Sequence, residues 1–230
     1  VDASIEGYNG TIFCYGQTGS GKTFTIVGGD PEVGLAGILP RALSELYAHS
    51  SERAVDGFET QIEVTFLELY RASLVDLLSK PLAAPGDHID DGRQAVVDVL
   101  EDSRGKPQLI YSRDRGTAAN LNELKGPWKK ALSAKEAMEF HHRGCRARAV
   151  GRTNLNEHSS RSHSIFMVRS TTEGPTGTTH GILTIVDLAG SENVNRSRSY
   201  EDHSRLQEAK SINKSLLGLG KCIQQLASDK

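Results

Sequence analysis

The sequence predicts a single α/β domain in which a central, mostly parallel sheet is flanked by helices. The first observation behind this prediction is a β-branched and aromatic run, residues 11–15, that stops at a glycine-rich turn, as a buried strand does. The second is that further strand-like runs interleave with helical stretches along the chain. The third is the composition, because 230 residues with 37% hydrophobic side chains are enough for one domain with a core.

The N-terminal part begins with this strand and continues as an interrupted helix. A helix is expected from Lys22, and residues 28–31 (GGDP) break it. Helical spacing resumes over residues 38–49, where apolar side chains recur at positions 39, 42, 43 and 46. The simplest interpretation is a loop inserted into a helix.

The rest of the chain alternates between the two periodicities. Residues 61–70 alternate apolar and polar side chains, which is typical of a half-buried strand. Further strands are expected at residues 96–100, 164–169 and 182–186, and helices at residues 135–143 and 206–227.

The composition also excludes several classes of protein. The 27 basic and 29 acidic side chains leave a net charge of −2, which argues against a disordered charged tail. The chain has no run of roughly 18 apolar residues and no secretory signal, so we expect a soluble, intracellular protein without a membrane partner. Cys14, Cys145 and Cys222 form no Cys-x-x-Cys pair and are interpreted as reduced thiols. Because the chain lacks an initiator Met and its last helical pattern runs almost to Lys230, we expect it to be part of something longer.

A phosphate-binding loop is predicted at residues 16–23, which fit the pattern G-x-x-x-x-G-K-[ST] between a strand and a helix. In such a loop the backbone N–H groups surround the β-phosphate, the lysine reaches the β- and γ-phosphates, and the last hydroxyl ligates Mg²⁺. The predicted nucleotide-binding residues are Gly16, Gln17, Thr18, Gly19, Ser20, Gly21, Lys22 and Thr23, the last also a Mg²⁺ ligand. A chance glycine-rich turn is the alternative, and the flanking elements disfavour it.

A second motif follows the apolar strand at residues 182–186. Asp187 ends this strand, where a carboxylate can help to hold the Mg²⁺ shell, and Gly190 can offer its N–H to a γ-phosphate. By itself the pattern D-x-x-G would usually be a strand-ending turn. Together with the phosphate-binding loop it predicts a switch that senses whether the γ-phosphate is present.

A polar run, residues 156–163 (NEHSSRSH), precedes the strand expected at residues 164–169. Its short hydroxyl and amide groups make sense if they close over a nucleotide, with a serine completing the Mg²⁺ shell. Taken alone, the run is equally compatible with a plain surface turn.

Four segments together resemble the kinesin motor domain, in the same order and over essentially the whole chain. They are residues 7–23 (GYNGTIFCYGQTGSGKT), 156–163 (NEHSSRSH), 187–192 (DLAGSE) and 208–220 (EAKSINKSLLGLG). A GTPase would need an N-K-x-D guanine reader, whereas the pair Asn213 and Lys214 continues as Ser215 and Leu216. The resemblance implies a P-loop NTPase fold over residues 1–230, incomplete at both ends, with switch I at 156–163 and switch II at 187–192.

The resemblance also assigns roles at matching positions. Ser160 would ligate Mg²⁺, and Asp187 would do so through water. Asn156 and Ser159 would lie close to the γ-phosphate and the attacking water. Arg161 would pair with Glu192 when the switches close, and that pair would gate hydrolysis. Glu192 would relay a proton from the lytic water through a second water.

Basic side chains suggest where a partner binds. Along the helix expected near the C-terminus, one apolar stripe repeats at about 3.6 residues per turn, and Lys210, Lys214 and Lys221 fall on the opposite face. Lysines of this kind are usually solvated surface. In a kinesin this helix, about residues 205–228, faces the acidic microtubule, and Arg196 and Arg198 would join its basic surface.

The stretch from Arg104 to Arg152 is also basic, with twelve bases against four acids. Residues 103–132 within it depart from the usual family pattern. The whole stretch from Arg104 to Arg152 is either a contact surface for a polyanion or a solvated face with a flexible loop.

The resemblance implies an ATP-dependent microtubule motor, that is, a Mg²⁺-dependent ATPase stimulated by microtubules. The expected partner is tubulin, with no nucleic acid, and the expected location is the cytoplasm and cytoskeleton. Dimerisation and cargo would depend on segments outside this chain. Two alternatives stay open: a non-motile kinesin-like microtubule-binding scaffold, and a truncated motor fragment without activity.

Overall fold

The computed structural model describes residues 1–30, 33–70, 72–79, 95–112, 126–150, 161–175, 177–192 and 203–228. The helices are α1 (Asp2–Ile5), α2 (Lys22–Val27), α3 (Ile38–Ala54), α4 (Ala134–Val150) and α5 (His203–Ser228). The strands are β1 (Gly10–Cys14), β2 (Glu59–Tyr70), β3 (Ser73–Asp76), β4 (Ala95–Glu101), β5 (Pro107–Tyr111), β6 (Lys129–Lys130), β7 (His163–Gly174) and β8 (Gly177–Asp187). The strands expected from the sequence are confirmed as β1, β2, β4, β7 and β8.

The strands form one sheet in the order β1-β8-β7-β2-β3-β4-β5, and β6 pairs with β2. The pairing of β1 with β8 is parallel, whereas the other described pairs are antiparallel. The prediction of a mostly parallel sheet is therefore wrong, although the α/β class is confirmed. The reason is that β2 and β3, and likewise β7 and β8, are joined by two-residue connections, which can only reverse the chain.

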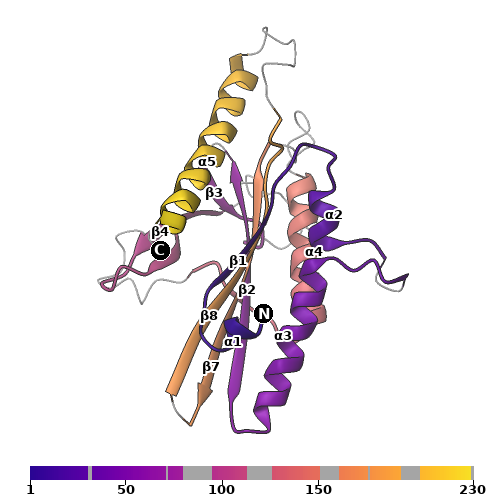
Figure 1. The fold of residues 1–230 in the computed structure, drawn as a ribbon, viewed down its shortest axis with the longest axis vertical. Coiled ribbons are helices and arrows are strands. Elements are labelled where there is room, and N and C mark those ends of the chain that lie inside the picture. Colours follow the sequence, from indigo (N-terminus) through magenta and orange to yellow (C-terminus); the bar gives the residue numbers. More distant parts are fainter. Residues whose placement is uncertain are drawn as a thin grey trace, which may run out of the picture.

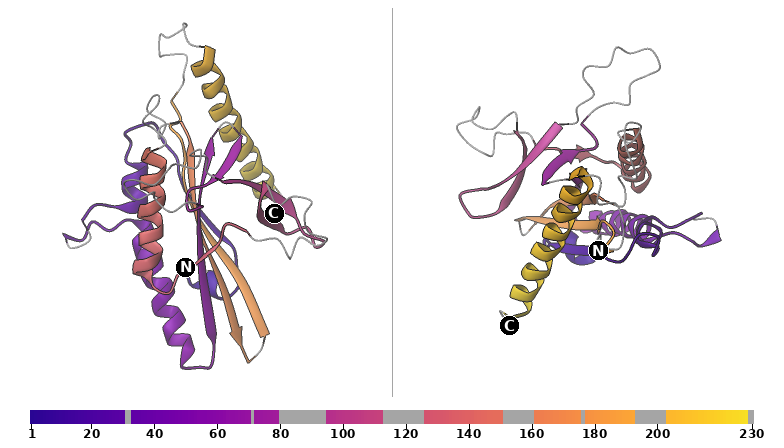
Figure 2. Two further views of the ribbon diagram at one scale, coloured as in Figure 1. Left: turned by 180° about the vertical axis from the view of Figure 1, so that it is seen from behind. Right: turned by 90° about the horizontal axis from the view of Figure 1, so that it is seen from above.

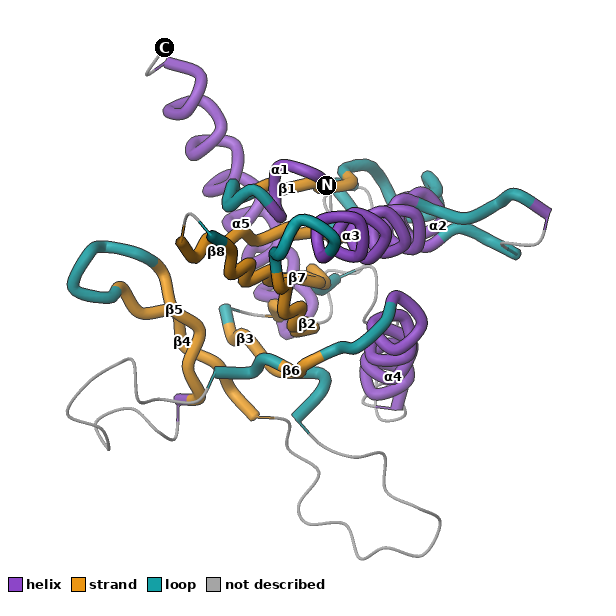
Figure 3. Tube along the Cα trace, turned by 90° about the horizontal axis from the view of Figure 1, so that it is seen from below, coloured by secondary structure: helices purple, strands orange, loops and turns teal. Residues whose placement is uncertain are grey.

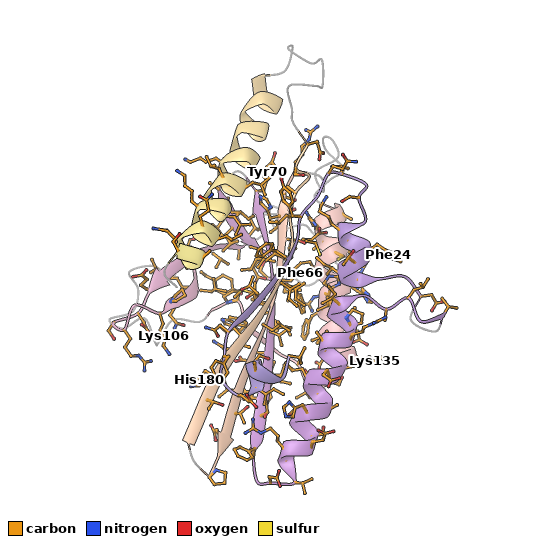
Figure 4. All side chains as sticks on the ribbon, in the orientation of Figure 1. Phe24, Phe66, Tyr70, Lys106, Lys135 and His180 are labelled. Carbon is orange, nitrogen blue, oxygen red and sulfur yellow. The ribbon has the colours of Figure 1, made fainter. Side chains whose placement is uncertain are left out.

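Helices cover both faces of the sheet. Helices α2, α3 and α4 lie on one face, and α5 lies on the other, as the views from the front, from behind and from below agree (Figures 1, 2 and 3). The larger core fills the space between the sheet and the helices α1 to α4. Successive side chains of β2 point to opposite faces of the sheet. Phe66 belongs to this core, while Leu67 packs with Val97 and Tyr111 on the other side. Figure 4 shows Phe66 at the centre of the molecule.

The predicted interruption after the first helix is confirmed. Helix α2 ends at Val27, and Gly28 follows it with φ 85°, a left-handed value that favours glycine. Gly28 then pairs with Ala36 in an isolated bridge, and a Cβ at Gly28 would collide with the backbone of Leu35 and Gly37. This bridge closes the inserted loop before α3 begins.

Three short strands are absent from the sequence-based expectation: β3, β5 and β6. Each has too few residues to show a clear alternation, and β5 and β6 lie within the stretch 103–132 that departs from the family pattern. Their sheet partners are β2 and β4, so tertiary pairing decides their conformation. Among the helices that the structure describes, none is both long and apolar enough to span a bilayer.

Candidate functional site

The predicted phosphate-binding loop connects β1 to α2 at one edge of the sheet. Gly19 and Gly21 adopt φ values of 80° and 90°, which residues other than glycine rarely adopt. The ammonium group of Lys22 folds across the loop and donates to the carbonyl oxygens of Gly16 (3.0 Å) and Gln17 (2.9 Å). The loop thus holds one positive charge at its centre, as a phosphate-binding site requires.

The parallel pairing of β1 and β8 brings the two predicted motifs together. Cys14 and Asp187 are partners in this register, so the end of β8 lies beside the start of the loop. The Thr23 hydroxyl donates to Asp187 Oδ2 over 2.5 Å. The other carboxylate oxygen, Oδ1, is buried and has no hydrogen-bond partner among the described residues. A carboxylate oxygen left free beside a hydroxyl is the hard-oxygen donor set that Mg²⁺ prefers, so these residues fit the ion.

The backbone after β8 also runs beside the predicted phosphate-binding loop and is hydrogen-bonded to the start of that loop. The N–H of Leu188 donates to the Cys14 carbonyl (3.3 Å), and the N–H of Ser191 donates to the Gly16 carbonyl (3.1 Å). A Cβ on Gly190 would collide with the Glu192 carboxylate and the Thr18 hydroxyl. A side chain at this position would therefore disturb the contact between Glu192 and Thr18.

Glu192 makes direct contact with the phosphate-binding loop through Thr18. Its carboxylate accepts from the Thr18 backbone N–H at 2.9 Å and from the Thr18 hydroxyl. Desolvation alone would raise the pKa of Glu192, but the hydrogen bonds from Thr18 and the charge of Lys22 outweigh it and hold the pKa below its usual range. The carboxylate is thus ionised at neutral pH and linked to the loop.

The predicted partner of Glu192 was Arg161. Arg161 is half-buried in the structure, and the Glu192 carboxylate accepts from Thr18. The ion pair with Arg161 stays a prediction for the closed state of the switches.

Several predicted site residues cannot be placed. Asn156, Ser159 and Ser160 of the predicted switch I lie outside the described residues, as do Arg196 and Arg198, which precede α5, and the side chain of Lys210. Lys214 and Lys221 are exposed on α5. Their exposure is compatible both with a binding surface and with simple solvation.

The end of the run 156–163, the predicted switch I, is anchored by a half-buried ionic network that the sequence did not reveal. Arg148 of α4 pairs with Glu68 of β2 (Nε to Oε1, 2.8 Å) and donates to the carbonyl and hydroxyl oxygens of Ser162. The Ser162 hydroxyl in turn donates to Glu68 over 2.6 Å. Arg148 was visible only as one charge in the basic stretch, because no local pattern indicates a partner 80 residues away.

His163 is a second residue to which the sequence assigned no role. Its Nδ1 accepts from the backbone N–H of Ala189 over 3.0 Å, and its Nε2 lies 2.8 Å from the Ser215 hydroxyl of α5. In the sequence, the indication that His163 has a role was its position as the last residue of the run 156–163.

The sheet order, the loop between β1 and α2 and the carboxylate at the end of β8 define a P-loop nucleotide-binding protein. The family model described as kinesin motor domain matches residues 1–230, and the chain belongs to this family. The resemblance inferred from the four motifs is thereby confirmed, as is the P-loop NTPase fold.

Relatives among characterised proteins cover nearly all of the chain. It is 34% identical over 229 residues to the kinesin-like protein KIN-14G of Oryza sativa subsp. japonica. This alignment covers 99% of this chain and 29% of the relative. It is 37% identical over 230 residues to the kinesin heavy chain of Strongylocentrotus purpuratus, covering 98% of this chain and 19% of the relative. The chain therefore spans less than a third of the length of these relatives.

Solved structures agree with this assignment. The structure of a fast kinesin superimposes with a TM-score of 0.73 at 34% identity, covering all of this chain and 57% of that one. The motor domain of Kar3 from Saccharomyces cerevisiae gives a TM-score of 0.68 at 32% identity, covering 95% of this chain and 57% of that one.

Proposed function

We propose that this chain is the catalytic part of an ATP-dependent microtubule motor, an ATPase whose turnover is stimulated by microtubules. The observation that carries the proposal is the direct connection between the phosphate-binding loop and the switch after β8. Thr18 contacts Glu192, and Thr23 contacts Asp187. A group bound on the loop must therefore disturb the switch, which is what coupling nucleotide state to shape requires.

Thr23 and Asp187 are the described residues that would hold Mg²⁺, and Ser160 of switch I is the third proposed ligand. When bound, the ion would neutralise charge on the phosphate oxygens. Lys22 adds a further positive charge on the loop, where its ammonium group already lies. Binding of the phosphates is thus assigned to the loop and to the end of β8.

Hydrolysis is assigned to the switches. Glu192 would relay the proton of the attacking water, and Gly190 would offer its N–H to the γ-phosphate. Asn156 and Ser159 would position the water, and Arg161 would hold Glu192 in the closed state. Glu192 accepts from Thr18, and on closure its carboxylate would also accept from Arg161.

The track-binding surface is assigned to α5 and the loop before it. The proposed contacts are Arg196, Arg198, Lys210, Lys214 and Lys221, whose positive charge complements acidic tubulin. Lys214 and Lys221 are exposed on α5, and this helix lies on the face of the sheet opposite α2, α3 and α4 (Figure 1). The corresponding location is the microtubule cytoskeleton of the cytoplasm.

The proposal is tested by measuring ATP turnover of the full-length protein with and without microtubules. Turnover should rise with microtubules, and Lys22→Ala should abolish both basal and stimulated turnover. The matched control is Lys135→Ala, because Lys135 is exposed on α4, away from the loop (Figure 4). Microtubule binding without any ATP turnover in the unmodified protein would instead identify a scaffold.

A further inference from the structure

A single buried imidazole joins the nucleotide switch to the helix proposed to face the microtubule. His163, at the start of β7, is 5% exposed. One of its ring nitrogens contacts Ala189, which precedes Gly190 in switch II, and the other contacts Ser215 in α5. The ring therefore contacts both the segment proposed to sense the γ-phosphate and the helix proposed to bind the microtubule.

The contact with Ala189 fixes the tautomer of His163. A backbone amide can only donate, so Nδ1 must carry a lone pair, and the proton of the neutral ring lies on Nε2. The Nε2–H group then donates to the Ser215 hydroxyl oxygen. Burial and the nearby Arg148 lower the pKa of His163, against a weaker opposite effect of Asp187, so the ring stays neutral at physiological pH.

The backbone on either side of His163 is held firmly. Ser162 is anchored by Glu68 and Arg148, and His163 itself pairs with Leu69 of β2 in the sheet register. The ring nitrogens belong to one planar ring, so no rotatable bond lies between them. A shift of Ser215 that keeps its hydrogen bond therefore moves the ring and, with it, the acceptor of the Ala189 N–H group.

We propose that His163 is a positioning residue that transmits the position of α5 to the Ala189–Gly190 turn through its hydrogen bonds to Ser215 and Ala189. This proposal rests on the proposed function, because it takes α5 as the track-facing helix and Gly190 as the γ-phosphate contact. A movement of α5 on its track would be passed to Gly190 through this ring. Loss of either hydrogen bond should uncouple track binding from hydrolysis without removing either one.

Two substitutions break the contact with α5 in different ways. Ser215→Ala removes the hydroxyl, and His163→Asn keeps an acceptor near the Nδ1 position but is too short to reach Ser215. Each should lower the microtubule-stimulated kcat by about 3- to 10-fold, the effect of one net hydrogen bond. Basal turnover of Ser215→Ala and the microtubule concentration for half-maximal stimulation should stay unchanged.

Matched controls separate coupling from general damage to the helix. Ser215→Thr retains a hydroxyl and should retain stimulation. Ser228→Ala removes another serine hydroxyl from α5, one that donates to Gln224 of its own helix, and should have no effect. The double variant His163→Asn with Ser215→Ala should lose no more than either single variant, because both remove the same bond.

The outcomes are distinguishable. An unmodified protein that microtubules do not stimulate contradicts the proposed function and with it this inference. If the unmodified protein is stimulated and Ser215→Ala behaves like Ser215→Thr and Ser228→Ala, the proposed function stands and the role of His163 is wrong. The imidazole ¹⁵N chemical shifts give a readout independent of turnover, since a proton on Nδ1 would also overturn the inference.

Discussion

Glu192 lies where the two motifs that the sequence predicted best come into contact. Its carboxylate accepts from the backbone and hydroxyl of Thr18, a residue 174 positions earlier in the chain. The spacing of either motif could not reveal this contact, because it depends on the parallel pairing of β1 with β8. In the proton relay that the resemblance implies for Glu192, the same carboxylate would also have to accept from a water.

We predict that Glu192→Ala separates nucleotide binding from hydrolysis. The variant should bind ATP and microtubules normally but lose on the order of 10² or more in turnover, because a proton relay acts mainly in the transition state. Single-turnover hydrolysis together with nucleotide affinity measures the two effects. Glu173→Ala, an exposed change near the far end of β7, is the control. A large loss of ATP affinity would assign Glu192 a structural role instead.

His141 contributes to the pH dependence of the free energy of unfolding. It is 5% exposed and stacks on Phe66, with ring centroids 4.9 Å apart. Burial, with a smaller effect of the neighbouring His142, lowers its pKa to about 4. Because the unfolded state titrates near 6.5, it binds more protons than the folded state between these values. Stability should therefore fall as pH drops below about 6.5, by about 2 kcal/mol at pH 5.

Urea unfolding at pH 7.5 and pH 5 measures this loss. His141→Phe keeps a ring of similar shape without a titrating group, so most of the difference attributed to this residue should disappear. His180→Phe replaces an exposed histidine of β8 and should leave the difference unchanged. An equal pH dependence in all three proteins would contradict the assignment to His141.

At the scale of elements, helix α4 packs against β2 through a glycine. A Cβ on Gly144 would collide with the ring of Phe66, which is 2% exposed. Ala137 and His141 lie on the same buried stripe of α4. This close approach also carries Arg148, one turn further on, to Glu68 and Ser162, so packing of the helix positions the anchor of switch I.

We predict that Gly144→Ala destabilises the domain, although alanine favours helices. Overpacking of a full core costs about 1 to 3 kcal/mol, which exceeds the ~1 kcal/mol gained in helix propensity. Gly218→Ala in α5 is the matched control, because a Cβ there meets no atom within 4 Å. That variant should be neutral or slightly stabilising. Thermal unfolding of both variants checks the difference, and similar melting temperatures would contradict the proposed packing.

At the scale of the whole molecule, the two sides of the sheet are expected to have different partners. Helices α2, α3 and α4 share the larger core, whereas among the described helices α5 lies on the opposite side (Figure 2). Lys214 and Lys221 of α5 are exposed. If α5 binds an acidic track, the attraction must be screened by salt, because the Debye length is only about 8 Å at physiological ionic strength.

We predict that microtubule affinity falls steeply as salt concentration rises. Replacing Lys210, Lys214 and Lys221 by Ala should flatten this dependence, because fewer charges then contribute. The control carries three alanines on the opposite side of the sheet, in place of the exposed Arg41, Lys135 and Arg146 of α3 and α4. Co-sedimentation over a range of salt concentrations measures the slopes. An unchanged slope in the first variant would remove α5 from the interface.

The sequence by itself located the loop and the aspartate of the candidate site and most of the elements. The loop at residues 16–23, the aspartate at the end of β8 and the interruption after α2 follow from local residue types and spacing. Such features can be found from the sequence because glycines with positive φ, a lysine and a hydroxyl act within a few residues of one another. The periodicities also located β1, β2, β4, β7, β8 and the longer helices.

Only the tertiary structure decided the direction of the strands and the contacts between motifs. The sheet is antiparallel at every described pair except β1 with β8, which a strand's own apolar pattern does not encode. The bonds from Thr18 to Glu192, from Arg148 to Glu68 and from His163 to Ser215 join residues 174, 80 and 52 positions apart. The physical reason is that a hydrogen bond depends on distance in space, and for these pairs only the packed sheet and helices set that distance.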